Sequence, residues 1–89
     1  MIVPRVRKVY FEEDWMVFEG DTFKTKMPLQ KVSRKLLLAN ETDRLVFSFS
    51  PSGYTISWNS LGVSLSVSGL LAKWGSPELV EQMMKKKEP

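Results

Sequence analysis

The chain has 89 residues, of which 43% are hydrophobic and 26% are charged, and its formal net charge is +3. A chain of this length and composition folds as one small globular domain, so we expect a single domain over residues 1–89. The sequence contains no cysteine and no histidine. Their absence excludes disulfides, thiolate nucleophiles, metal sites built from these residues and Ser-His or Cys-His catalytic pairs. We therefore expect a protein that is not an enzyme and that uses no cofactor and no metal.

The chain lacks the apolar segments that direct a protein to or across a membrane. No stretch approaches the roughly 20 apolar residues of a membrane-spanning helix. Residues 1–5, M-I-V-P-R, lack the apolar run of a signal peptide. The missing cysteines are also typical of a reducing compartment. These features predict a cytoplasmic protein without a membrane partner.

Alternating side-chain character in the N-terminal third predicts three strands joined by tight turns. The strands are expected at about residues 5–11, 14–19 and 22–27. In the second strand Trp15 and Val17 share one face. Met16 and Phe18 share the other, so both faces are apolar, as is typical of a strand in the middle of a sheet.

After these strands the apolar period changes from two residues to between three and four. Pro28 cannot donate to a strand ladder, and the following leucines and valine predict an amphipathic helix at about residues 29–38. A polar loop is expected at 40–44. Two further strands, at about 45–50 and 54–58, then form a hairpin around a type I turn.

The C-terminal third predicts one more strand and two helical segments. The strand is expected at about 62–65, and a short helical turn at 67–73 follows it. Ser76 and Pro77 are typical of a helix start, which predicts a C-terminal helix at about 77–86. All these elements together predict an α+β fold with one antiparallel sheet of five to six strands.

The block from Leu36 to Leu71 contains an L-L-x-A helix end, a Gly-Tyr turn, an I-x-W strand and an L-S-V-x-G-L-L segment. It resembles the bacterial and phage domain-of-unknown-function family 2442. The matching positions are Gly53, Tyr54, Ile56, Trp58, Leu61, Leu65, Ser66, Val67, Gly69, Leu70 and Leu71. The predicted strand pair at 6–19 matches the opening of the family. The resemblance covers residues 3–71 and leaves a C-terminal helical tail at 72–89.

This resemblance implies a sheet with a helix across it, and no catalytic site. Some family members are fused to a helix-turn-helix DNA-binding domain, and others are encoded beside a second small domain in an arrangement like a toxin and antitoxin pair. Family members usually carry acids where this chain has Gly62, Val63 and Ser64. We therefore expect the function of this chain to be set elsewhere, on the basic helix face or in the C-terminal tail.

Large apolar side chains form the first candidate functional group. Three tryptophans and five methionines are more than one small core buries easily, and both residue types are favoured at partner-binding surfaces. The candidates for a protein-binding surface are Trp15, Trp74, Met83 and Met84, with Phe18 as a further one. The alternative is that these side chains fill the core, as large aromatics commonly do.

A basic segment forms the second candidate group. Its five cations lie within twelve residues that contain no acid, and they are Lys24, Lys26, Lys31, Arg34 and Lys35. Such a set can neutralise several phosphates if the side chains share one surface with exposed aromatics. The alternative is a solvated surface, because the net charge is small and no nucleic-acid-binding motif accompanies the segment.

Acidic residues form the third candidate group: Glu12, Glu13, Asp14, Glu41 and Asp43. Paired carboxylates can serve as acid and base or hold a hard cation. These acids fall where turns are expected, however, and acids in turns are usually hydrated. We therefore place a hydrolase that works without histidine behind the two binding functions.

The sequence favours a non-enzymatic protein-interaction or regulatory module, with an antitoxin-like role as its more specific form. Its expected partner is another protein, encoded by an adjacent gene, or a second copy of the chain. The alternative is an accessory nucleic-acid-binding module that uses the basic segment. The discriminating feature is whether the five cations converge on one surface beside exposed aromatics.

Overall fold

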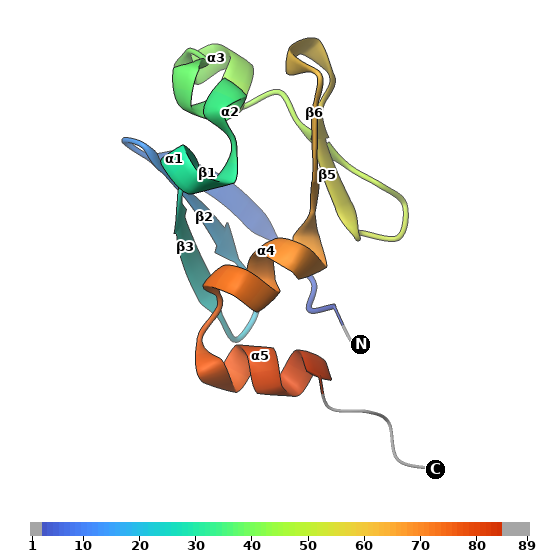
Figure 1. The fold of residues 1–89 in the computed structure, drawn as a ribbon. Helices are drawn as coiled ribbons and strands as arrows, with labels where there is room; N and C mark the ends of the chain where they lie inside the picture. Colours follow the sequence, from blue (N-terminus) through green and yellow to red (C-terminus); the bar gives the residue numbers. More distant parts are fainter. Residues whose placement is uncertain (1–2, 85–89) are drawn as a thin grey trace.

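Residues 3–84, which the computed structural model describes, form two three-stranded antiparallel sheets, five α-helices and one 3-10 turn (Figure 1). The α+β class is therefore as predicted. In Figure 1 the two sheets stand beside each other, with α1, α2 and α3 at one end of the molecule and α4 and α5 at the other. No helix within this part of the chain is long and apolar enough to cross a membrane.

The first sheet, sheet A, contains the three N-terminal strands in sequence order. They are β1 (Lys8–Glu12), β2 (Trp15–Glu19) and β3 (Lys24–Pro28). The central position of β2 agrees with its two apolar faces, since Met16, Val17 and Phe18 are all fully buried. Gly20 ends β2 at a tight turn, where a Cβ would lie within 2.1 Å of the Phe23 ring. Any larger residue here would require the Phe23 ring to move.

The second sheet, sheet B, is separate from the first, so the predicted single sheet of five to six strands is wrong. Its strands are β4 (Ser48–Phe49), β5 (Thr55–Trp58) and β6 (Val63–Ser66), in that order. The predicted strand at 45–50 shrinks to two residues because the amides of Leu45 and Val46 bond to carbonyls of the preceding helical turn. The predicted turn between β4 and β5 is present, with the Gly53 amide donating to the Ser50 carbonyl at 2.8 Å.

Between the two sheets the chain forms short helices instead of the predicted single helix at 29–38. They are α1 (Leu29–Val32), α2 (Arg34–Leu38) and α3 (Glu41–Arg44). Ser33 is extended, with φ −160°, and its hydroxyl accepts the Leu36 amide at 3.3 Å, so it ends one helix and caps the next. The predicted loop at 40–44 is helical because the Asn40 side chain caps the Asp43 amide at 2.7 Å.

Helices also follow sheet B, close to their predicted positions. The 3-10 turn η1 (Asn59–Leu61) joins β5 to β6, and α4 (Val67–Trp74) and α5 (Pro77–Met84) complete the described chain. Ser66 caps α4 by accepting the Gly69 amide at 3.1 Å, and Ser76 accepts the Leu79 amide at 3.2 Å. The last two residues of the predicted helix at 77–86 lie outside the described part.

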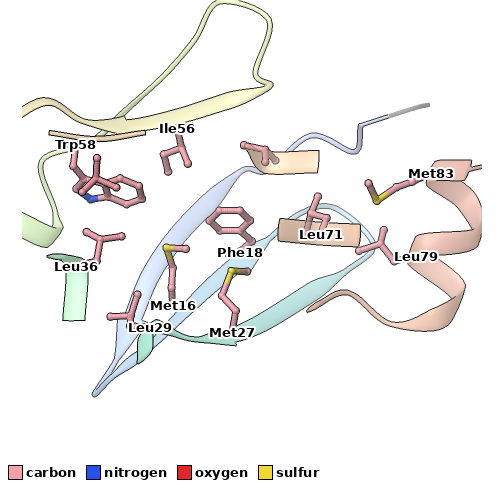
Figure 2. Close-up of a cluster of buried hydrophobic side chains, with 12 residues drawn as sticks. Met16, Phe18, Met27, Leu29, Leu36, Ile56, Trp58, Leu71, Leu79 and Met83 are labelled. Carbon is pink, nitrogen blue, oxygen red and sulfur yellow. The ribbon is translucent and has the colours of Figure 1, made fainter. Parts of the chain in front are cut away.

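One hydrophobic core joins both sheets and the helices (Figure 2). Its buried members are Met16, Phe18, Met27, Leu29, Leu36, Ile56, Trp58, Val63, Val67, Leu71, Leu79 and Met83. They come from the inner faces of sheets A and B and from helices α1, α2, α4 and α5. Helix α5 therefore packs into the same core as residues 3–71, although it lies in the predicted C-terminal tail.

Arg44 connects the parts of the fold that surround this core. Its guanidinium donates to the carbonyls of Glu13 (2.8 Å), Leu36 (2.9 Å) and Leu37 (2.9 Å), and its own carbonyl accepts the Trp58 indole N–H at 2.8 Å. Only 8% of the residue is exposed. A buried guanidinium is tolerated when its donors are used in this way.

We expect Arg44→Met to lower the free energy of unfolding by about 3 kcal/mol, because three carbonyls lose a donor that water replaces poorly. Urea denaturation measures the change. Arg34→Met, at an exposed position, is the matched control and is expected to change stability by about 0.5 kcal/mol or less. A loss of less than about 1 kcal/mol in Arg44→Met would mean that Arg44 does not hold these elements together.

The two-residue turn between β1 and β2 contains the one non-glycine residue with positive φ between residues 3 and 84, Glu13 at 54°. This conformation is unfavourable for a side chain with a Cβ. We expect Glu13→Gly to raise the free energy of unfolding by about 0.5 to 1 kcal/mol, since the carbonyl that Arg44 binds is retained. Thermal and urea unfolding measure the change, and Glu12→Gly in the adjacent strand should instead destabilise. A destabilised Glu13→Gly variant would contradict this account.

Candidate functional site

The face of sheet A that points away from the core is the best candidate for a functional surface. The strand register places three rows of residues on it: Lys8, Glu19 and Lys24; Tyr10, Val17 and Lys26; Glu12, Trp15 and Pro28. We call this surface the outer face. The opposite face carries Met16, Phe18 and Met27, which belong to the core.

The outer face has an apolar patch of its own. Val17 is fully buried but is not part of the core cluster. Its neighbours across the strands are Tyr10 and Lys26, and Trp15 lies two residues before it on the same face. Trp15 is 40% exposed. The Trp15 ring is thus partly exposed to water. Val17 beside it is covered by the other side chains of the outer face.

Lysines surround the two aromatic rings of the outer face. The Nζ atoms of Lys8 and Lys24 lie 5.5 and 5.9 Å from the centroid of the Tyr10 ring, and Nζ of Lys26 lies 5.2 Å from that of Trp15. These distances are in the range of cation–π interactions, worth about 0.5 to 1 kcal/mol each at exposed sites. The lysine stems also shield the apolar patch from water.

The acids of the outer face interact unequally with these lysines. Glu12 pairs with Lys26 at 3.3 Å. No ion pair within 4 Å joins Lys8 or Lys24 to any residue between 3 and 84. The Tyr10 hydroxyl, as a hydrogen-bonding partner, raises the pKa of Lys24 above its ordinary value of 10.5, and the nearby Glu19 and Glu12 carboxylates raise it further.

The structure does not bring the four predicted protein-interaction residues together. Trp15 lies on the outer face, whereas Met83 is 1% exposed and belongs to the core on the other side of sheet A. Trp74 is half-buried and packs against the same core, with the Lys73 Nζ 5.5 Å from its ring. Met84 is 58% exposed at the end of α5. The further candidate, Phe18, is fully buried.

The basic segment is also divided between surfaces. Lys24 and Lys26 lie beside Tyr10 and Trp15 on the outer face. The Lys35 ammonium instead lies near Gly62, between η1 and β6, 3.7 Å from where a Cβ on that glycine would stand. Two other members, Lys31 and Arg34, are exposed on α1 and α2. The five cations therefore do not converge on one surface.

Three of the candidate acids line a surface hollow beside Arg44. This hollow has a volume of about 450 Å³, and its lining consists of Tyr10, Phe11, Glu13, Asp14, Glu41, Arg44 and Leu45. Asp14 lies 3.4 Å from the Arg44 guanidinium, and Glu12 pairs with Lys26. Asp43 is half-buried in α3. Between residues 3 and 84, no group of three or more acids is arranged to hold a metal ion.

Four residues of the outer face, Tyr10, Val17, Glu19 and Pro28, were not among the predicted site residues, and Lys8 was not in the predicted set of five cations. Their signal was present in the sequence as the hairpin register. Once the turn falls at Glu13 and Asp14, alternation places Tyr10 opposite Val17 and Lys8 opposite Glu19. The turn between β2 and β3 then places Lys24 opposite Glu19 and Lys26 opposite Val17 on the same face.

Comparisons of the chain with protein-family models, with curated proteins and with solved structures find no match. The resemblance to family 2442 stays a prediction from the sequence block.

We expect Tyr10→Phe to lower the pKa of Lys24, because the hydroxyl that raises it is lost. A titration followed by the ¹³Cε shift of Lys24 measures the change. Since the folded pKa exceeds the unfolded value, the contribution of Lys24 to stability is complete below the unfolded pKa and is lost as the pH rises through the folded pKa. Tyr54→Phe, in the turn before β5, is the control. An equal effect of both variants would contradict the assignment to Tyr10.

Proposed function

We propose that this protein is a non-enzymatic protein-interaction module that binds its partner through the outer face of sheet A. The observation that carries the proposal is the position of Trp15. Of the three tryptophans, Trp58 is fully buried and Trp74 is half-buried against the core, whereas Trp15 is 40% exposed on a face turned away from it. Tryptophan is the residue type most enriched among the dominant contacts of protein interfaces.

The surroundings of Trp15 support a binding role. Most buried side chains of the helices join the core on the inner side of sheet A, so the outer face remains directed to solvent. It presents the exposed ring of Trp15 and the half-buried ring of Tyr10 among charged residues, and aromatic side chains are enriched at protein interfaces. The rings of Tyr10 and Trp15 also lose little conformational freedom on binding, since few of their torsions rotate.

We propose that the partner is another small protein, encoded by an adjacent gene, which the chain binds as an antitoxin-like or regulatory subunit. The resemblance to family 2442 supports this choice. The composition supports it as well, because a chain without histidine and cysteine lacks the side chains most used for acid-base and nucleophilic catalysis.

An accessory nucleic-acid-binding function is the second candidate. It is favoured by the three lysines that lie within 6 Å of the Tyr10 or Trp15 ring centroid, because aromatic rings and cations together bind single strands. Glu12 and Glu19 occupy the same face, however, and Lys35 lies away from it, near Gly62. The face therefore offers a phosphate backbone little net positive charge.

The proposal is tested by placing a photoreactive benzoylphenylalanine at position 15 of the full chain and irradiating cells of the source organism. We expect a crosslinked adduct with a discrete protein, because the residue at position 15 would lie within the interface. Mass spectrometry identifies the adduct, and nuclease digestion shows whether it contains nucleic acid.

The matched control carries the same amino acid at position 54, since Tyr54 is an exposed aromatic residue of the β4–β5 turn. We expect no equivalent adduct there. Equal adducts at both positions, or no adduct at position 15, would refute the proposed surface. An adduct at position 15 that disappears on nuclease digestion would favour the nucleic-acid function instead.

A further inference from the structure

We infer that two copies of the chain pair through the free edges of their β1 strands and form one continuous sheet. In this dimer the two β1 strands run antiparallel about a two-fold axis at Tyr10, and the strand order is β3-β2-β1-β1-β2-β3. The arrangement places the two outer faces side by side. It concerns self-association and is independent of the partner proposed for the outer face.

The free edge of β1 carries backbone groups that can bind another strand. β1 is an edge strand of sheet A. The two-residue turn makes Glu12 and Trp15 a hydrogen-bonded pair, and such pairs alternate along the hairpin. The amides and carbonyls of Val9 and Phe11 therefore point away from β2. Between residues 3 and 84, no backbone hydrogen bond outside the sheet ladder reaches them.

The pairing of β2 with β3 supports this alternation. With the backbone groups of Trp15 directed to β1, those of Met16 and Phe18 are directed to β3. Pro28, which has no amide hydrogen, stands opposite Trp15, where the alternation requires no ladder bond. The proline therefore costs sheet A no hydrogen bond.

The free groups of β1 determine how a second β1 strand can pair with it. Antiparallel pairing about Tyr10 places Val9 opposite Phe11 of the second copy, and these residues exchange their free amides and carbonyls as a hydrogen-bonded pair. A shift by one residue would set the free groups against residues whose groups already bond to β2. A shift by two residues would leave two residues of each strand without a partner.

The charges of β1 favour a second copy of the chain as the occupant of this edge. The same register places Lys8 opposite Glu12 of the second copy, and Glu12 opposite its Lys8. Opposite charges directly across two strands are stabilising. Lys8 is in no ion pair with another residue between 3 and 84, and the Glu12 side chain remains 51% exposed although it pairs with Lys26. Parallel pairing in register would instead bring like charges together.

The other free edges of the two sheets lack this complementarity. The free edge of β3 is formed by Lys24, Lys26 and Pro28, and lysine and proline are residues that protect an edge from pairing. In sheet B, β4 has only two residues, and β6 (Val63–Ser66) contains no charge that could set a register. β1 is thus the edge best suited to self-pairing.

Apolar side chains beside the β1 edge would be covered in the dimer. Val9 and Phe11 are half-buried, and Leu45 is 62% exposed. Leu45 lines the hollow of about 450 Å³ beside Arg44 together with Tyr10 and Phe11. A strand added to β1 would lie against this hollow and remove apolar surface from water. Since one strand edge buries less than the roughly 800 Å² per partner of a stable interface, we expect a dissociation constant on the order of 10 to 100 µM.

Charge-exchange variants of the full chain test the inference by sedimentation velocity at about 5 to 500 µM. We expect a monomer–dimer equilibrium for the wild-type chain. Lys8→Glu and Glu12→Lys each place like charges opposite each other, and each is expected to weaken dimerisation about tenfold or more. A mixture of these two variants restores both opposite-charge pairs, so we expect a heterodimer about as tight as the wild-type dimer.

Lys31→Glu and Glu81→Lys are the matched controls, because they make the same charge changes at exposed positions outside sheet A. We expect them to leave dimerisation unchanged, and circular dichroism checks that every variant folds. Amide hydrogen exchange locates the interface. Raising the concentration over the same range should slow exchange at Val9 and Phe11 and leave Tyr10 unchanged, because the Tyr10 amide already bonds to β2.

Four outcomes would overturn the inference. They are a wild-type chain that stays monomeric at the highest concentration, equal weakening by the variants and their controls, a mixture of Lys8→Glu with Glu12→Lys that forms no heterodimer, and a dimer that leaves exchange at Val9 and Phe11 unchanged.

Discussion

The fold depends on one buried guanidinium. Arg44 ends α3, and its side chain donates to carbonyls of the β1–β2 turn and of α2, while its own carbonyl receives the Trp58 indole N–H. Sheet A, the short helices and sheet B therefore meet at a single residue. The ion pair with Asp14 adds little, because that carboxylate is 71% exposed and lies 3.4 Å away. The hydrogen bonds that the guanidinium directs to three separate backbone carbonyls are what a lysine at this position could not reproduce.

This junction explains why the chain forms two sheets and why one sheet face stays uncovered. The segment between β3 and β4 is divided into three short helices, each too short to be stable alone. Arg44, at the end of α3, bonds to α2, to the β1–β2 turn and to Trp58 of sheet B, whereas α1 is anchored by Leu29 in the core. Both sheets then direct their apolar faces to one core, which α4 and α5 close. In a domain of this size the available helices pack on the inner side. No helix within residues 3–84 covers the outer face of sheet A. There Val17 is covered only by the aromatic rings and lysine stems of neighbouring outer-face residues.

Local sequence signals predicted most helices and strands. The predictions failed where tertiary contacts determine the structure. The caps at Ser66 and Ser76 and the turn at Ser50 to Gly53 depend on near neighbours in sequence, and all three are present. The division at Ser33 and the helical turn after Asn40 follow cap signals that the leucine periodicity obscured. No local pattern indicates that Arg44 is buried, because its acceptors lie up to 31 residues away. Only part of the outer face could be predicted from the sequence. Composition and alternation singled out Trp15, Lys24 and Lys26, whereas placing Tyr10 on this face requires the exact pairing of β1 with β2.

The same reasoning moves the expected site of function away from the block that makes the chain recognisable. In that block Gly62 has φ 66°, where a side chain is strained, and Val63 is 8% exposed in the core. Ser64 shares a hydrogen bond with Ser57 at 3.2 Å across the outer side of sheet B. An acid at position 63 would be buried beside apolar side chains, so the fold of sheet B accounts for its valine without any ligand. The C-terminal helix, the other expected location, contributes Leu79 and Met83 to the core. The surface with both an exposed tryptophan and unpaired lysines lies instead within residues 8–28, before the recognisable block begins.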